Sequence, residues 1–268
     1  MAASADDLVL VRIEERPQGR VAFVTLNDPR RLNCLSSALA RDFIQKVRTL
    51  AGDTGLRAMV LTGAGDRSFI AGANIHEMKD LSPAEAEAFI TLVHGMSEAC
   101  QALPVPVIAR INGYCFGAGP ELVAACDLRI ACEEAEFAMP EVLVGLPSVI
   151  EAALLPRLIG WGRAQQFIYT GQSISARVAE TWGLVNAVVP RSDLDAAVET
   201  MLAPILQSGP HAIRIQKDLF HAWQRMAATD GVAEGIRAFR RAFDTGEPNR
   251  MLAQQVQRLK DNKAARQR

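Results

Sequence analysis

The sequence predicts an α/β fold over residues 1–190 and a helical region over residues 191–268. In the first part, short apolar and β-branched runs alternate with stretches whose apolar residues recur at helical spacing. In the second part, after about Pro190, the helical spacing prevails. Alternating strands and helices are typical of a layered α/β core, and a run of helices after such a core is typical of an appended region.

The chain begins with a predicted β-hairpin. Residues 8–14 and 21–26 are apolar and β-branched, and the polar segment 16–20 between them contains a proline and a glycine. A helix is expected next, because Ser36 is a suitable N-cap and the following apolar residues share one helical face. These apolar residues are Leu39, Phe43, Val47 and Leu50.

Further strands and helices alternate along the rest of the chain. Ser82, Pro83 and Glu85 mark a helix start, because serine caps, proline suits the first helical position and glutamate completes a capping box. Gly171 and Gly183 are expected to end later helices. The predicted strands are residues 58–62, 107–111, 128–131 and 185–189.

The composition favours a globular protein, with 49% apolar and 22% charged residues. A formal net charge of −1 provides no field for nucleic acid or an anionic membrane, and we interpret the basic residues in 237–268 as a solvated helical face. No uncharged apolar stretch reaches the ~18 residues of a membrane span. Residues 1–7 do not resemble a signal peptide. The expected location is therefore the cytoplasm, with neither nucleic acid nor a membrane as partner.

The cysteines indicate a reducing compartment. Their number is odd, and no C-x-x-C pair occurs. Most have apolar neighbours, as expected of small core residues. No set of histidines and cysteines has metal-ligand spacing, so we expect no metal. The cysteines are Cys34, Cys100, Cys115, Cys126 and Cys132.

Two loops, residues 70–74 and 117–120, carry small residues between a buried strand and a helix. Small side chains admit a ligand close to the backbone, and a helix start offers unpaired N–H groups to negative charge. The loops could form an oxyanion hole together, or they could be two tight turns without a ligand. Neither matches a nucleotide-binding motif, because one lacks G-x-G-x-x-G and the other lacks the Gly-Lys-Ser/Thr ending.

Glu121 and Glu141 are candidate acid/base groups, because both have apolar neighbours in the sequence. Apolar surroundings disfavour the charged carboxylate, which suits proton transfer near neutral pH. Two such carboxyls could hold a water molecule; the alternative is that each is a helix cap or a core ion-pair partner. The histidines are interpreted as structural or surface residues, although His76 could line a pocket beside the first loop. No G-x-S-x-G elbow supports a serine hydrolase.

Several segments within residues 8–260 resemble the crotonase (enoyl-CoA hydratase/isomerase) family, and they occur in the same order. The run Phe-Ile-Ala-Gly-Ala-Asn-Ile-His-Glu-Met resembles the family's F-x-A-G-A-D-I-x-E-M segment. The run Phe-Ala-Met-Pro-Glu-Val-Leu-Val-Gly resembles its F-x-x-P-E-x-x-x-G segment. The matching segments are residues 26–35, 69–78, 112–122, 137–145 and 182–186.

The resemblance implies a spiral of repeated β-β-α units with two sheets, and a C-terminal helical region that assembles trimers or hexamers. It implies an oxyanion hole made of the backbone N–H groups of Ala73 and Ala118. It implies no cofactor, because coenzyme A is part of the acyl-CoA substrate. A less specific part of the resemblance implies that Lys217 and Phe220 contact the nucleotide end of CoA. The residues expected to contact substrate are Arg30, Arg31, Leu32, Ala71, Gly72, Asn74, Ile75, His76, Gly117 and Ser148.

The family's hydratases carry glutamates at the positions of both Glu121 and Glu141, whereas its isomerases generally keep only the second. The resemblance therefore implies reversible hydration of a trans-2-enoyl-CoA to a 3-hydroxyacyl-CoA. Glu121 would activate the water that attacks C3, and Glu141 would exchange the proton at C2. The alternatives are an isomerase or another reaction of the same enolate, and a catalytically silent protein that binds acyl-CoA or RNA.

The chain departs from the family pattern at three places. Asn74 replaces the usual aspartate, and Ala118 replaces a common glycine. After Gly145 the chain lacks the Gly-rich stretch of many hydratases and instead has bulkier residues, which are expected to reshape the acyl pocket. In that stretch Ser148 and Glu151 have the spacing of a capping box, which predicts a helix start. The alternative is that Glu151 enters the active site.

Overall fold

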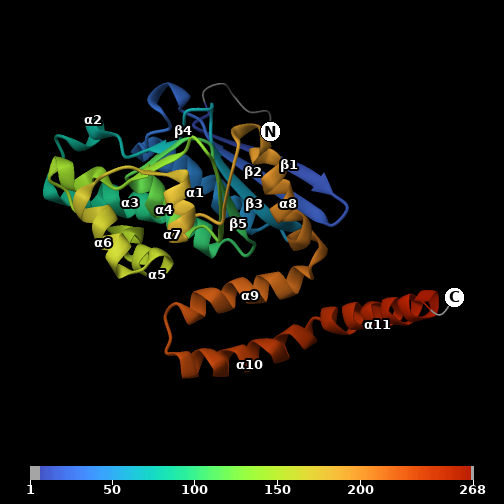
Figure 1. Ribbon diagram of the computed structural model, residues 1–268. Helices are drawn as coiled ribbons and strands as arrows, with labels where there is room; N and C mark the ends of the chain where they lie inside the picture. Colours follow the sequence, from blue (N-terminus) through green and yellow to red (C-terminus); the bar gives the residue numbers. More distant parts are fainter. Residues whose placement is uncertain (1–6, 267–268) are drawn as a thin grey trace. The chain divides into compact units, whose positions relative to one another are not determined.

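The computed structural model describes residues 7–266 (Figure 1). The chain forms two compact units, Met1–Leu202 and Ala203–Arg268, and the division between them falls inside α8 (Leu194–Gln207). Each unit is described by itself.

The first unit is built on two sheets. In the six-stranded sheet, β1 and β2 form the predicted antiparallel hairpin, and the remaining neighbours pair in parallel. Its strands in spatial order are β1 (Val9–Arg16), β2 (Gly19–Leu26), β3 (Leu56–Gly63), β5 (Val107–Ile111), β7 (Leu128–Cys132) and β10 (Ala187–Val189). The four-stranded sheet contains β4 (Ser68–Ala71), β6 (Tyr114–Phe116), β8 (Glu136–Ala138) and β9 (Ile174–Ser175).

From β3 to β8, successive strands alternate between the two sheets. β3, β5 and β7 belong to the large sheet, and the strand that follows each of them, β4, β6 or β8, belongs to the small sheet. A helical segment follows each such pair before the next strand of the large sheet. This order is the repeated β-β-α spiral that the sequence predicts. Because β4, β6 and β8 run parallel, their carboxyl ends lie at one edge of the small sheet.

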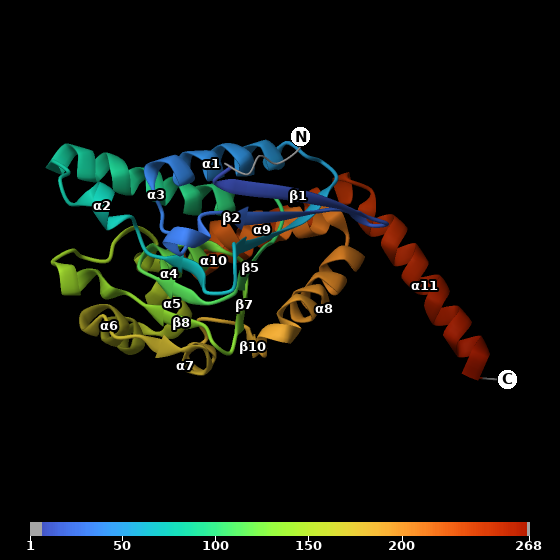
Figure 2. The same cartoon turned by 90° about the horizontal axis from the view of Figure 1, so that it is seen from above.

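Helices cover the sheets, and Figure 2 shows α1 and α3 side by side along the large sheet. The helices of this unit before α8 are α1 (Ser37–Ala51), α2 (Ile75–Met78), α3 (Pro83–Ala102), α4 (Ala118–Ala125), α5 (Leu155–Ile159), α6 (Trp161–Thr170) and α7 (Ala176–Trp182). Short 3₁₀ turns are η1 (Pro29–Arg31), η2 (Pro140–Val144), η3 (Ile150–Leu154) and η4 (Arg191–Asp193).

Most of the predicted caps are confirmed. The Ser36 hydroxyl accepts the N–H of Leu39, and Ser82 forms the reciprocal capping box with Glu85 at the start of α3. Gly171 and Gly183 end α6 and α7 in the left-handed conformation. The core lies between the sheets and these helices, and it includes the predicted apolar face of α1.

The second unit contains α9 (Pro210–Trp223), α10 (Ala228–Asp244) and α11 (Glu247–Arg266). Glu247 is buried, and its carboxylate accepts the N–H groups of His211 and Ala212 at the start of α9. A negative charge at that end of a helix is stabilising. The helices also expose large apolar side chains, which for α10 are Val232, Ile236, Phe239 and Phe243.

Candidate active site

The two small-residue loops meet where β4 and β6 end. Ala71 is paired with Phe116, and each loop turns immediately after its strand through a glycine with positive φ, 98° at Gly72 and 58° at Gly117. A Cβ added to Gly117 would lie 3.4 Å from the Cα of Gly72 and 2.8 Å from Oε1 of Glu141. Glycine is therefore required at Gly117 both for the backbone conformation and for the space.

The segment after β2 is bonded to the first loop. The carbonyl of Leu32 accepts the N–H of Ala71 at 3.1 Å, and the N–H of Leu35 donates to the carbonyl of Gly72 at 2.9 Å. The N–H of Asn74 donates in turn to the carbonyl of Leu35 at 2.8 Å. Residues from two predicted substrate-contacting segments are thus side by side.

Asn33 fixes the shape of that segment. Its side chain is fully buried and donates to the carbonyl of Ser68 at 2.8 Å, while its oxygen accepts the N–H of Asp28 at 3.0 Å. These bonds hold the ends of the turn around η1 together. Arg30 and Arg31 belong to η1, and both residues are exposed. Cations held at this rim are suited to an anionic ligand.

The loops leave two amides without an acceptor. Within residues 7–266, neither the N–H of Ala73 nor that of Ala118 has a hydrogen-bond partner. Ala118 is the first residue of α4, where the backbone N–H has no partner within the helix. Unpaired amides at a helix start attract negative charge.

Asn74, Ile75 and His76 form the start of α2 beside this loop. The Asn74 side chain caps α2 by accepting the N–H of His76 at 3.1 Å. Ile75 and His76 are both exposed. The asparagine that replaces the family's aspartate thus retains a capping role without a charge.

Glu121 projects from α4 into a buried site. The residue is 3% exposed, and Val149 donates its N–H to Oε1 of the carboxyl at 3.2 Å. Burial, followed by the negative charges of Glu141 and Glu151, raises the pKa of Glu121 to about 9, against the lowering effect of the amides of Val149 and Ala152. The carboxyl therefore holds a proton near neutral pH.

Glu141 lies in η2, just after β8, and is half-buried. The hydroxyl of Ser148 donates to Oε2 of Glu141 at 2.8 Å. Its other oxygen is the atom that a Cβ on Gly117 would approach. Glu141 therefore reaches the junction of the two loops, and its charge is felt at Glu121.

The predicted capping box of Ser148 and Glu151 is wrong. The segment forms the 3₁₀ turn η3, whose N-cap Val149 makes no side-chain cap. Ser148 instead bonds Glu141, and Oε1 of Glu151 lies 2.8 Å from Nδ1 of His94 in α3. Partners distant in the sequence hold both side chains, so the local capping bonds do not form.

Two contacts of the site had no signal in the sequence. The N–H of Val149 on Glu121 is a backbone group, which no residue type reveals. The sequence predicts a structural or surface role for His94, and only the packing of α3 against η3 brings it to Glu151. The sequence favours a capping role for Glu151 and gives its entry into the site only as the alternative.

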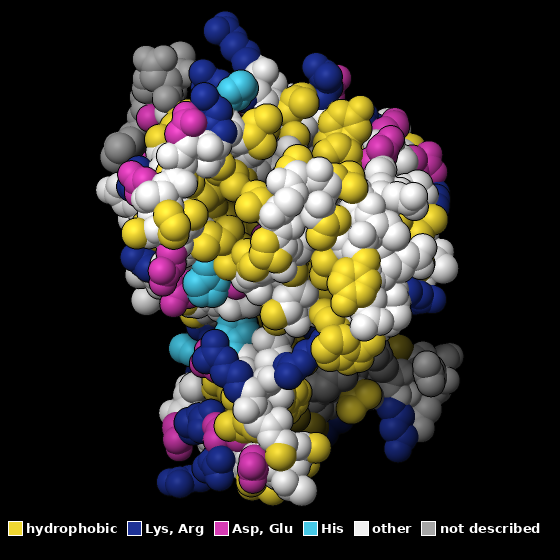
Figure 3. Space-filling model, turned by 90° about the vertical axis from the view of Figure 1, so that its left-hand side faces the viewer, with side chains coloured by type: hydrophobic (Ala, Val, Ile, Leu, Met, Phe, Trp, Pro, Cys, Tyr) yellow, Lys and Arg dark blue, Asp and Glu magenta, His cyan; other side chains and the backbone are white. Residues whose placement is uncertain are grey.

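Apolar side chains are exposed close to the carboxyls. Figure 3 shows hydrophobic side chains gathered on the side of the molecule where α2, α3 and α6 lie in Figure 1. The segment that follows Glu141 contributes four exposed ones, which are Leu143, Val144, Leu146 and Val149. Such a surface suits an apolar ligand.

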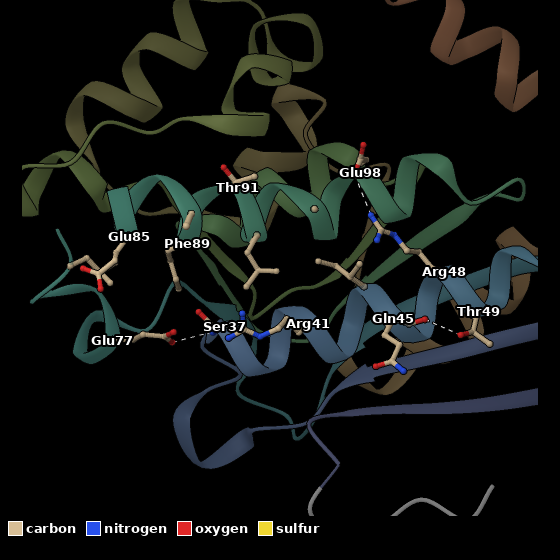
Figure 4. A pocket seen from close by; sticks show the side chains of 15 residues that line it. Ser37, Arg41, Gln45, Arg48, Thr49, Glu77, Glu85, Phe89, Thr91 and Glu98 are labelled. Carbon is tan, nitrogen blue, oxygen red and sulfur yellow. Dashed lines mark hydrogen bonds and ion pairs between the residues drawn. The ribbon is translucent and has the colours of Figure 1, made fainter. Parts of the chain in front are cut away.

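A separate groove of about 1030 Å³ opens between α1 and α3 (Figure 4). Glu77 and Ser37 are bonded at one end of it, and Arg48 pairs with Glu98 at the other. None of the residues that line it is a predicted site residue. The groove is therefore distinct from the site of the two glutamates.

Other site types find no support within residues 7–266. No group of three His, Cys, Asp or Glu side chains there is placed to hold a metal ion. No helix of that range is long and apolar enough to cross a bilayer. In α9, Lys217 is buried and Phe220 is exposed, and their expected contact with CoA stays a prediction.

Comparison with known proteins gives a consistent result. The family model Enoyl-CoA hydratase/isomerase matches residues 16–261. The chain is 34% identical to the short-chain-enoyl-CoA hydratase of Clostridium acetobutylicum, over 91% of this chain and 94% of that protein. It is 37% identical to the crotonyl-CoA hydratase of Syntrophomonas wolfei, over 74% and 76% of the two chains.

Comparison with solved structures points to the same family. The crystal structure of enoyl-CoA hydratase from Bacillus anthracis superposes with a TM-score of 0.81 and 32% identity, covering 86% of this chain and 89% of that one. The match of the family model over most of the sequence, together with these relatives, identifies the chain as a member of the enoyl-CoA hydratase/isomerase family.

Proposed function

We propose that the protein catalyses the reversible hydration of a trans-2-enoyl-CoA to a 3-hydroxyacyl-CoA. The observation that carries the proposal is the convergence of Glu121 and Glu141 beside two loops whose amides at Ala73 and Ala118 have no acceptor among the described residues. A thioester enolate needs donors for its oxygen and proton carriers for the two carbons beside it. The names of the hydratase relatives support the same reaction.

In the proposed chemistry, the two carboxyls exchange protons with the bound water and the substrate. Because Glu121 is neutral in the free protein, its proton first passes through the bound water to Glu141. Glu121 then accepts a proton from that water, and the water oxygen bonds C3. The C2–C3 π electrons move into the thioester, whose oxygen accepts the N–H groups of Ala73 and Ala118 as an enolate. Glu141 finally protonates C2, which restores the starting protonation.

The backbone donors account for much of the rate. Loss of one oxyanion donor typically costs about 10²–10³ in rate. The CoA arm lies along Arg30, Arg31 and Leu32 and along the first loop, where exposed guanidinium groups meet the phosphates. No cofactor beyond the CoA of the substrate takes part.

Two further functions compete with hydration. An isomerase would shift the double bond without adding water, and the buried Glu121 argues against it because one carboxyl is enough for that reaction. A silent binding protein would need no carboxyl with a raised pKa, yet the pKa of Glu121 is about 9. Hydration is the reaction that uses both carboxyls.

The test is an assay of the purified protein in water labelled with ¹⁸O, with crotonyl-CoA and a panel of longer enoyl-CoAs. We expect loss of the conjugated thioester absorbance and one labelled oxygen in the product. A moved double bond without label would establish an isomerase. Binding of CoA thioesters without turnover of any substrate would establish a silent protein.

We also propose a cytoplasmic homotrimer or homohexamer. The exposed apolar side chains of α10 support self-association, because single helices rarely leave such a face uncovered. All five cysteines are unbridged, as expected in a reducing compartment.

A further inference from the structure

One carboxylate of the first unit is buried without full hydrogen bonding. Glu151 is 6% exposed, and its Oε1 lies 2.8 Å from Nδ1 of His94. Its Oε2 is buried and has no hydrogen-bond partner among residues 7–266. A buried carboxylate oxygen without a donor is costly, so its persistence calls for a function.

Glu151 belongs to the segment that encloses Glu121. The N–H of Val149 donates to Glu121 at 3.2 Å, and the amide of Ala152 also interacts with that carboxyl. Glu151 lies between these two donors in the chain, and its charge acts on Glu121. The turn η3, which contains Glu151, also packs against α4, which contains Glu121, so both carboxyls belong to the same buried part of the first unit.

The backbone between Val149 and Glu151 is strained. Ile150 has a φ of 39°, in the left-handed region that β-branched residues avoid. Such a conformation is unfavourable and persists where the surrounding structure requires it. The left-handed residue Ile150 stands between Val149, whose N–H donates to Glu121, and Glu151, whose side chain contacts His94.

His94 holds one oxygen of the Glu151 carboxylate. It projects from α3 with its side chain 47% exposed, and it bonds only one oxygen of Glu151. That bond fixes the carboxylate and leaves Oε2 to accept a hydrogen bond from something else.

We propose that Glu151 is a specificity-determining residue whose Oε2 accepts a hydrogen bond from a hydroxyl group on the acyl chain. The substrate class is then a hydroxylated trans-2-enoyl-CoA. This inference rests on the proposed function, in which Glu121 acts on the water at C3. Because Glu151 neighbours Glu121, the hydroxyl lies beyond C3, on C4 or C5. A neutral hydroxyl fits better than an ammonium group, which would lose more hydration on burial.

The test compares matched substrate pairs. kcat/KM is measured for 4-hydroxybut-2-enoyl-CoA against crotonyl-CoA, and for 5-hydroxypent-2-enoyl-CoA against pent-2-enoyl-CoA. We expect the hydroxylated member of at least one pair to be preferred by about tenfold or more, because a site built to bond a hydroxyl rejects the analogue that lacks it. Glu151→Leu should abolish the preference, and Glu151→Gln, which keeps an acceptor oxygen, should retain part of it. The control Glu87→Leu, an exposed glutamate of α3, should leave the ratio unchanged.

Three results would overturn the inference: no preference in the wild type, a preference that survives Glu151→Leu, or a variant that slows both members of a pair equally. If Glu151→Leu does not fold, calorimetric binding of 4-hydroxybutanoyl-CoA and butanoyl-CoA to the wild type and to Glu151→Gln decides, and equal affinities reject the inference. Turnover of none of the four enoyl-CoAs would contradict the proposed function itself, and the inference would fall with it.

Discussion

At the scale of single residues, the electrostatics of Glu121 dominates the site. The residue is buried beside two other glutamates, and its pKa of about 9 reflects burial first and their charges second. A carboxyl that keeps its proton can donate a hydrogen bond to a water molecule and later carry that water's proton. The same arrangement makes the free energy of unfolding depend on pH.

The first prediction concerns that sensitivity. The pKa of Glu121 is raised from 4.5 in the unfolded chain, so its contribution to stability is complete below about pH 4.5 and is lost as the pH rises towards about 9. Glu121→Gln cannot lose a proton. Its free energy of unfolding relative to wild type should therefore rise between about pH 6 and about pH 8, by up to about 3 kcal/mol.

Urea unfolding at the two pH values measures this difference. Glu87→Gln, at an exposed position, should have the same free energy of unfolding as the wild type at both pH values. A Glu121→Gln advantage that is the same at both pH values would mean that the wild-type carboxyl is already ionised.

Gly117 provides the second prediction. A side chain there would meet the Glu141 carboxylate at 2.8 Å in a backbone conformation with a φ of 58°. Gly117→Ala should lower kcat by about 10²-fold, because a displacement of about 1 Å in a catalytic group has an effect of that size.

Gly160→Ala is the matched control for Gly117→Ala. Gly160 also has a positive φ, of 83°, and nothing lies within 4 Å of an added Cβ. The control should lose stability and keep its kcat. Equal kcat values for the two variants would place Glu141 away from the second loop.

At the scale of elements, strands and most helix caps could be predicted because their signals are local. The hairpin, the capping box of Ser82 and Glu85 and the glycine stops each depend on a few neighbouring residues. The turn η3 could not be predicted, because Ser148 and Glu151 bond Glu141 and His94 rather than each other. The sequence predicts the two glutamates and the two loops as site residues, whereas the contacts of the Val149 amide and of His94 depend on tertiary packing.

The segment around η1 carries the third prediction. Asn33 bonds Ser68 across to β4 and also receives the N–H of Asp28, all while fully buried. Asn33→Ala leaves several buried groups unpaired, so it should destabilise the protein by about 2–4 kcal/mol. It should also raise KM more than it lowers kcat, because the loosened segment carries Arg30 and Arg31.

Asn27→Ala is a suitable control, because the Asn27 side chain donates a single bond, to the carbonyl of Asp7 at 2.9 Å. Asn27→Ala should lower the free energy of unfolding by about 1 kcal/mol and leave KM unchanged. Should both variants change KM alike, the η1 segment would have no role in binding the CoA arm.

At the scale of the whole molecule, the second unit exposes large apolar side chains along α10. Ile236 and Phe239 of α10 are 70% and 71% exposed. The fourth prediction is that this face is covered by other copies of the chain. Ile236→Glu together with Phe239→Glu should convert the proposed trimer or hexamer to monomers, measured by light scattering after size exclusion. Arg240→Ala, an exposed polar neighbour, should leave the assembly intact.

The central claim is that Glu121 and Glu141 act together on one enoyl thioester. Its most direct measurement is the rate of crotonyl-CoA hydration by the wild type, Glu121→Gln and Glu141→Gln, each first shown to be folded by its melting temperature. Loss of a positioned proton carrier predicts a fall of about 10²–10⁴-fold in kcat for each variant. Rates within about threefold of wild type in both variants would contradict the account, since neither carboxyl would then carry a proton in the reaction.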